Sequence, residues 1–242
     1  MNIWDAIIIT PFVNVLLFIY NLIGGNFGIA IILFTILIRL ITHPLTVQQL
    51  KGTQGMQKLQ SDPRYLEMQK KYKDDRERLA QEQMKLYKEL GINPLGSCLP
   101  TLIQFPIIIG LYQSIIRALA ATPMELLDLT KHLYPNFLPV SNLIPLHSNF
   151  LWMNLGRPDL IPIPGIPLIG GIPILAVIVV ITTYLQSKLM TPPSTGANDQ
   201  GAQMTKMMNL YMPFLMGYLA LTLASGLSLY FVVSNVIGIV QY

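Results

Sequence analysis

A single arginine, Arg39, stands inside a run of apolar residues that extends from position 27 to position 41 (FGIAIILFTILIRLI). The run is apolar enough to enter a lipid bilayer, where a charged side chain at the centre of a helix costs about 2.5 kcal/mol or considerably more. Charged residues in membrane helices are therefore rare, and they generally face a water-filled cavity that serves a function. Arg39 thus predicts a membrane fold in which one helix presents a guanidinium to a polar cavity.

The composition and the apolar stretches also indicate an integral membrane protein. Hydrophobic residues make up 52% of the chain and charged residues 12%, whereas soluble domains carry about 25% charged residues. A membrane-spanning helix needs about 20 residues. Five stretches approach or exceed that length, at 7–23, 27–42, 99–119, 168–189 and 207–242.

The last stretch is too long for one crossing, because at about 1.5 Å per residue it exceeds a hydrocarbon core of ~30 Å. We expect Ala224, Ser225 and Gly226 to form a turn that divides it. We expect Pro44 to end the first span, because proline disfavours a helical residue before it. The sequence therefore predicts an all-α membrane protein with five spans. They are expected at about 27–43, 99–119, 168–189, 206–223 and 226–242.

Residues 1–26 form a separate N-terminal segment before the core, which comprises residues 27–242. The segment is apolar but contains Asp5, so that both a membrane span and a helix lying in the membrane interface fit its pattern. Trp4 and Tyr20 suit the depth of the lipid headgroups. We therefore favour an N-terminal interfacial helix.

The segment 45–98 is polar and carries ten of the sixteen Lys and Arg residues of the chain. Positively charged loops stay on the cytoplasmic side of a membrane, so we expect a cytoplasmic helical hairpin here. Asp74 or Asp75 would cap its second helix. The N-terminus then lies outside an inner (plasma) membrane and the C-terminus in the cytoplasm. The proline-rich loop 120–167 would lie outside and a flexible loop, 190–205, inside.

Polar residues recur at helical spacing on the predicted spans, which places each set on one helix face. The sets are Gly28, Thr35, Arg39 and Thr42; Thr101, Gln104 and Tyr112; Thr182, Thr183 and Gln186; and Ser234 and Asn235, one turn beyond Tyr230 and Phe231. Small and polar residues can also simply hold membrane helices together. That alternative stays open for all of them except Arg39, because no predicted span offers it an acidic partner.

Methionines mark the fourth span and its entrance. They are Met204, Met207, Met208, Met212 and Met216. Ordinary apolar packing accounts for such a set, and so does a pliable surface for varied hydrophobic ligands, because methionine repacks easily.

The chain lacks the motifs of an enzyme or a metalloprotein. No nucleophile elbow, HExxH motif or phosphate-binding glycine loop occurs in it. The single cysteine cannot form an intrachain disulfide, and the three histidines share no ligand spacing. We therefore expect no enzymatic activity, no cofactor and no metal.

Three segments resemble the YidC/Oxa/Alb family of membrane protein insertases, in its bacterial YidC type. They are GIAIILFTILIRLITHPLTVQQLKGTQGMQKLQ (28–60), KLYKELGINPLGSCLPTLIQFPIIIGLY (85–112) and SGLSLYFVVSNVIGIVQ (225–241). The resemblance is to a short form without the large periplasmic domain. It implies a five-span core around a positively charged groove that is open to the cytoplasm and to lipid and closed to the outside.

The resemblance also implies roles for individual residues. Arg39 matches the groove arginine of the family, and Thr35 and the pair Tyr230–Phe231 match groove positions where clients are contacted. Gln186 resembles a polar groove position on the third core span. Gln104 joins this candidate site through the polar stripe of the second span.

A protein with these features would be an insertase and chaperone that takes hydrophobic client segments through a hydrated groove into the bilayer. The client would leave past the third and fifth spans. The expected partners are nascent membrane protein clients and lipids, with the Sec translocon and the ribosome as further candidates and no specific nucleic acid readout. The alternative is a small-anion transporter or channel that binds its ligand at Arg39.

Overall fold

The structure is a computed structural model in which helices dominate. It describes residues 2–60, 62–72, 75–91, 99–120, 122–134, 146–160, 171–190 and 200–241. The helical elements are η1 (Asp5–Ile9), α1 (Thr10–Leu22), α2 (Phe27–Gln60), α3 (Pro63–Lys71), α4 (Arg76–Glu89), α5 (Leu99–Ala118), α6 (Pro123–Lys131), α7 (Ile174–Met190), α8 (Gln200–Thr222) and α9 (Ser225–Gln241). Two short strands, β1 (Asn149–Phe150) and β2 (Met153–Asn154), pair antiparallel.

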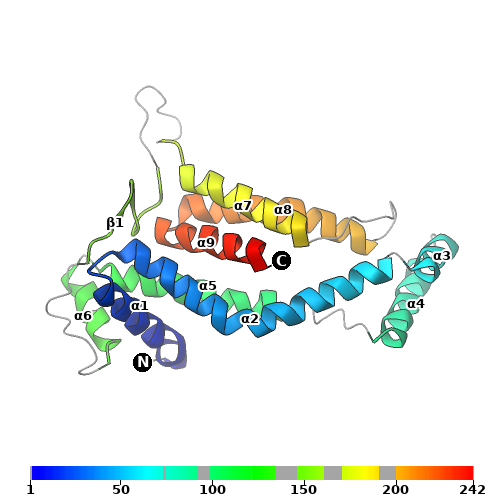
Figure 1. The fold of residues 1–242 in the computed structure, drawn as a ribbon, viewed down its shortest axis with the longest axis horizontal. Coiled ribbons are helices and arrows are strands. Elements are labelled where there is room, and N and C mark those ends of the chain that lie inside the picture. The colour runs from blue at the N-terminus through cyan, green and yellow to red at the C-terminus, as the bar shows by residue number, and fades with distance from the viewer. Residues whose placement is uncertain are drawn as a thin grey trace.

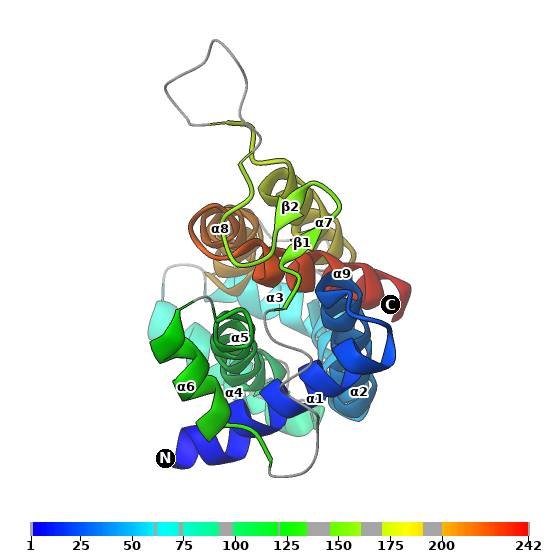
Figure 2. The same cartoon turned by 90° about the vertical axis from the view of Figure 1, so that its left-hand side faces the viewer.

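Five long helices run along one another as a bundle (Figure 1). Helix α9 lies inside it and packs against α2, α5, α7 and α8, while α7 and α8 pack against each other. The helices α3 and α4 lie beyond one end of the bundle, and α6 and the two strands lie at the other end (Figures 1 and 2). The polar residues of α9 are therefore enclosed by the remaining long helices.

The outer surface of the bundle is apolar, as a lipid environment requires. Large hydrophobic side chains stand exposed on α2, α5, α7 and α8, and those exposed to 60% or more on these helices are Leu40, Ile41, Met207, Leu210, Tyr211, Phe214 and Tyr218. Among the described residues, Asp5–Leu22 and Phe27–Gly52 are long and apolar enough to cross a membrane. The segments Ile174–Met190, Leu210–Thr222 and Ser225–Gln241 are apolar but shorter.

Helix α2 continues through Pro44 to Gln60, so the prediction that Pro44 ends this helix is wrong. A proline inside a helix removes one hydrogen bond and bends the helix more often than it ends it when packing supports both halves. Figure 1 shows such a bend about midway along α2. The Thr46 hydroxyl donates to the Thr42 carbonyl oxygen at 3.2 Å, across the position of the proline.

The other boundaries agree with the sequence to different degrees. The second and fifth predicted spans coincide with α5 and α9 to within one or two residues. Helix α8 begins at Gln200, inside the predicted loop 190–205, because its first residues are polar and hydropathy does not reveal them. Helix α7 begins at Ile174, after the predicted start at 168, and 161–170 lie outside the described residues.

The N-terminal segment is helical from η1 through α1, and it packs against α2 and α5. Its buried face includes Ile9, Val13 and Leu16, none of which is exposed. The helix α1 runs obliquely across the bundle (Figures 1 and 2). That this segment lies in the membrane interface stays a prediction.

The helices α3 and α4 form a small unit with its own apolar contacts. Leu59 at the end of α2, Tyr65 and Leu86 make up its buried cluster. Asp75 caps α4 by accepting the Arg78 N–H at 3.1 Å, in line with one of the two predicted caps. Residues 73 and 74, where the turn is predicted, lie outside the described residues.

Asp62 caps α3 in the same way as Asp75 caps α4. Its carboxylate accepts the Arg64 N–H at 2.9 Å. Hydrogen bonds from the side chain and the backbone of Arg64 lower the pKa of Asp62. Aspartate is among the residues that best satisfy the free N–H groups at the start of a helix.

A segment that contains both strands, residues 149–160, closes the opposite end of the bundle and is called the clasp below. Its carbonyl oxygens at Leu155 and Arg157 accept the N–H groups of Gly226, at 3.0 Å, and of Ser225, at 2.8 Å. The Asp159 carboxylate accepts the Leu175 N–H at 2.9 Å. The clasp therefore satisfies the exposed N–H groups at the start of both α9 and α7.

Candidate functional site

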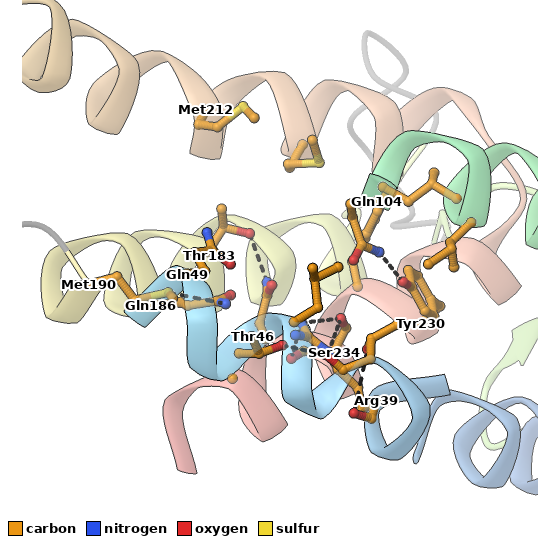
Figure 3. Close-up of a pocket in the computed structure, with 18 of the residues that line it drawn as sticks. Arg39, Thr46, Gln49, Gln104, Thr183, Gln186, Met190, Met212, Tyr230 and Ser234 are labelled. Atoms are coloured by element: carbon orange, nitrogen blue, oxygen red, sulfur yellow. Dashed lines mark hydrogen bonds between the residues drawn. The ribbon is translucent and has the colours of Figure 1, made fainter. Parts of the chain in front are cut away.

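The long helices enclose a cavity of about 210 Å³ to which α2, α5, α7, α8 and α9 all contribute (Figure 3). Its polar lining residues are Arg39, Thr42, Thr46, Gln49, Gln104, Thr183, Gln186, Tyr230, Ser234 and Asn235. The apolar ones include Ile107, Ile108, Met190, Met212, Met216 and Phe231. The cavity, called the groove below, thus has a polar wall and an apolar wall.

Arg39 is held in the groove by neutral partners. Its Nε donates to the Ser234 hydroxyl at 2.9 Å, and one terminal nitrogen donates to the Ser234 carbonyl oxygen at 2.8 Å and to the same hydroxyl. Within the described residues, no carboxylate forms an ion pair with Arg39. The charge of this guanidinium is therefore oriented by hydrogen bonds but is not neutralised.

Another partly buried arginine of this chain is treated differently. Arg117, on α5, lies 3.4 Å from the Asp5 carboxylate and 3.2 Å from the Asp128 carboxylate. These ion pairs connect η1 and α6 to α5. A buried arginine with a structural role needs such carboxylate partners, because a buried charge without a partner is costly. The absence of a carboxylate at Arg39 leaves its attraction available to an anionic ligand.

Two aromatic residues of α9 form part of the wall beside Arg39. Tyr230 is 2% exposed, and its hydroxyl accepts a hydrogen bond from the Gln104 side chain of α5. The Phe231 ring lies with its centroid 5.8 Å from that of Tyr230. The predicted residues Gln104, Tyr230 and Phe231 thus meet in the groove, although α5 and α9 are far apart in the sequence.

The third predicted span brings Gln186 to the same groove. A Cβ atom added to Gly238 of α9 would lie 2.5 Å from Gln186 Nε2, so the glycine leaves space for this amide. The Gln186 amide also lies 3.7 Å from the Met190 sulfur. A side chain at position 238 would require the Gln186 amide to move.

Helix α7 is bound directly to α9 by polar contacts. Asn235 Nδ2 donates to the hydroxyls of Thr182, at 3.1 Å, and Thr183, at 2.8 Å. The two helices also pack against each other along their length. The expectation that a client leaves past the third and fifth spans stays a prediction, and these hydrogen bonds favour another side of the groove as the exit.

Thr35 is the one predicted site residue that the structure does not bring to the groove. It has no exposed surface, and its hydroxyl donates to the Ile31 carbonyl oxygen of its own helix at 2.7 Å. Thr35 shares a helix face with Arg39 but lies one turn closer to the start of α2. At that position the helices pack closely and Thr35 is buried. In this structure Thr35 packs between helices and does not line the groove, and its contact with a client stays a prediction.

Sequence reasoning missed Thr46 and Gln49, which line the groove beyond Arg39 and Thr42. The alternating spacing of three and four residues, which places residues on one helix face, continues through both positions. It was cut short by the prediction that Pro44 ends the helix. Recognising that the spacing persists past the proline would have identified both residues.

The methionines divide between the groove and the outer surface. Met212 and Met216 line the groove on α8, and Met212 lies across it from Arg39 (Figure 3). Met207 is 68% exposed. The side chains of Met204 and Met208 lie outside the described residues, as does that of Thr101. Within the described part of the chain, no three His, Cys, Asp or Glu residues lie close enough together to hold a metal ion.

The fold and the groove define a class, namely helical membrane proteins whose bundle encloses a polar groove with an uncompensated arginine. The family model of the 60Kd inner membrane protein matches residues 18–242. The chain therefore belongs to this family, whose relatives are named membrane protein insertases. The resemblance seen in the sequence is thereby confirmed.

Relatives with these names align with nearly the whole chain. The membrane protein insertase YidC 2 of Bacillus anthracis is 34% identical over 99% of this chain and 80% of its own length. The insertase MisCA of Bacillus subtilis is 34% identical over 98% of this chain and 77% of its own length. The insertase YidC of Fusobacterium nucleatum is 36% identical over 90% of this chain and 84% of its own length.

A solved structure has the same fold. It is described as the active YidC insertase with the first transmembrane domain resolved, and it matches all of this chain with a TM-score of 0.60 and 27% identity. This chain covers 47% of the length of that protein. It thus spans about half of the solved chain.

Proposed function

We propose that this protein is a membrane protein insertase and chaperone that receives hydrophobic client segments in the groove and releases them into the bilayer. The observation that carries the proposal is the guanidinium of Arg39, which Ser234 orients and no carboxylate among the described residues neutralises. The relatives named insertases support the same function. A client whose leading region is acidic would supply the negative charge that pairs with Arg39.

The groove would act by shortening the apolar distance that a polar client region must cross. Water enters a cavity lined by Gln104, Gln186 and Arg39 far more readily than it enters lipid. The apolar helix of the client then gains about 25 cal/mol for each Å² that leaves water. The membrane potential adds ~2.3 kcal/mol per charge per 100 mV for an acidic region that moves to a positive outside.

The proposed topology has five spans, α2, α5, α7, α8 and α9, with the α3–α4 unit in the cytoplasm. The basic residues of that unit support this orientation, because positive loops remain inside. The clasp and the N-terminus then lie outside, and α1 lies in the outer interface. The oblique course of α1 supports this placement (Figure 2).

We propose that clients leave the groove between α5 and α8. The apolar wall there consists of Ile107 and Ile108 on α5 and Met212 and Met216 on α8. Beside it, Phe105 and Phe214 are 48% and 63% exposed on the same two helices. These apolar residues on both helices support an exit on this side, and methionine adapts to clients of different shape.

The partners of this activity are nascent membrane protein clients and the surrounding lipids. Contacts with the Sec translocon and with the ribosome remain predictions, and the α3–α4 unit is the part of the chain that would reach a ribosome. Transport of a small anion is the alternative use of Arg39. The liposome experiment below separates it from insertion.

The test is insertion of a single-span client with an acidic leading region into vesicles that contain only the purified protein. We expect the client to become protected from added protease in these vesicles and to stay accessible in empty ones. The release of an entrapped fluorescent anion is measured on the same vesicles. Anion release without client protection would identify a transporter and would contradict the proposal.

A further inference from the structure

The clasp lies level with the first turns of three spans. The Phe150 ring occupies the space beside Gly28, where an added Cβ atom would lie 2.1 Å from the ring. Gly28 is the second residue of α2, and the clasp also binds Ser225 at the start of α9 and Leu175 at the start of α7. In the proposed five-span topology, the level at which these helices begin is that of a membrane interface.

The turn between β1 and β2 exposes two large apolar residues at this level. Leu151 is 74% exposed and Trp152 is 51% exposed, whereas Met153 and Leu155, which follow in the same segment, are 4% and 0% exposed. The clasp therefore buries one set of apolar side chains in the protein and turns another set away from it. Water is an unfavourable surrounding for the second set.

The backbone of this turn is also unusual for the residues that occupy it. Leu151 has a φ of 54°, in the left-handed region. Two-residue hairpin turns prefer Gly, Asn or Asp at such a position, because a bulky side chain is strained there. A leucine that is both strained and exposed gains little from packing in the protein, so its side chain is free to contact a surrounding apolar phase.

We propose that Leu151 and Trp152 insert into the lipid interface on the side of the membrane where α2, α7 and α9 begin, and that they anchor the clasp there. The level of the clasp in the proposed topology favours lipid as the partner of Leu151 and Trp152, because tryptophan concentrates at the headgroup level. Val177 and Ile181, in the first half of α7, are also exposed apolar residues. Arg157, exposed on the clasp, adds a positive charge for lipid phosphates.

This inference rests on the proposed function in taking α2, α7 and α9 as membrane spans. The chain has two tryptophans, so that Trp4→Phe leaves Trp152 as the only one. We expect its fluorescence in vesicles to be quenched by lipids brominated near the headgroup more strongly than by lipids brominated near the chain end. Iodide in the water phase should quench it weakly.

The matched control is Trp152→Phe, which leaves Trp4, whose indole donates to Gln113 at 3.0 Å. Strong iodide quenching of Trp152 with no quenching by either brominated lipid would overturn the proposal. Lipid quenching that disappears when the protein is diluted in the membrane would also overturn the proposal. The surface around Leu151 and Trp152 would then depend on contact with a second copy of the protein. No client is present, so that these outcomes leave the insertase proposal untouched.

A second variant separates anchoring from a merely structural turn. Glycine adopts the left-handed conformation freely, so Leu151→Gly in the Trp4→Phe background should not lower the melting temperature in detergent. It removes the leucine from the interface, and quenching of Trp152 by the shallow brominated lipid should fall at least about twofold. Quenching that stays unchanged in this variant would mean that Leu151 does not hold the turn in lipid.

Discussion

Replacement of Arg39 by alanine is expected to reduce the insertion of clients with acidic leading regions by about tenfold or more. Opposite charges 4 Å apart attract each other by about 4 kcal/mol at an effective dielectric constant of 20. If a third of that energy lowers the activation free energy of insertion, losing it slows insertion about tenfold. The measurement is the initial rate of protease protection in vesicles at equal protein content, with a client of neutral leading region measured alongside.

Two variants that keep the charge serve as controls. Arg39→Lys retains a cation but not the paired contacts, and Ser234→Ala retains Arg39 but removes the hydroxyl that it binds. We expect both to insert acidic clients considerably faster than Arg39→Ala. If Ser234→Ala were as slow as Arg39→Ala, the arrangement of the groove rather than its charge would control insertion. Equal rates for neutral and acidic clients in Arg39→Ala would agree with the charge model.

The sequence predicts the helices of the bundle and Arg39 well, because both signals are local. An apolar stretch of sufficient length forms a helix in a membrane irrespective of its neighbours, and α5 and α9 follow this rule. The cost of a charge in such a stretch is likewise read from the stretch alone. The all-helical fold and the position of Arg39 follow directly.

The partners within the groove could not be predicted, because they depend on how distant helices pack. Arg39 and Ser234 are 195 positions apart, and nothing in either helix specifies the other. Polar residues at helical spacing define one face of a helix, but they do not show where along that face a cavity lies. For this reason Thr35 is buried on the same face on which Thr42 and Thr46 line the groove.

The clasp was equally inaccessible from the sequence. The sequence predicts a proline-rich loop across 120–167, and α6 lies within that range. The contacts of Asn154 and Arg157 with Ser225 join segments about 70 positions apart, and they use main-chain carbonyl groups that every residue possesses. Side-chain patterns carry no information on contacts of this kind.

Alanine at Gly226 is expected to lower the melting temperature in detergent by about 2–12 °C, and valine by more. An added Cβ atom would lie 3.1 Å from both Ile115 Cγ2 and the Leu155 carbonyl oxygen, and 3.2 Å from Ile31 Cδ1. The carbonyl group cannot retreat without losing the Gly226 N–H, which it accepts at 3.0 Å. Overpacking of this kind costs about 1–3 kcal/mol, and each kcal/mol shifts the melting temperature by about 2–4 °C at this chain length.

Gly156→Ala is the matched control, because the same atom added in the clasp meets only ordinary contacts. Its nearest neighbours would be Asn154 Oδ1 at 3.4 Å and Leu119 Cδ1 at 3.6 Å. We expect this variant to melt within about 2 °C of the unaltered protein, since a substitution that adds no strain changes stability by about 0.5 kcal/mol or less. Equal losses at Gly156 and Gly226 would show that space at the start of α9 is not what limits stability. A loss confined to Gly226 would mean that the close packing of the start of α9 against the clasp, α2 and α5 contributes to the stability of the fold.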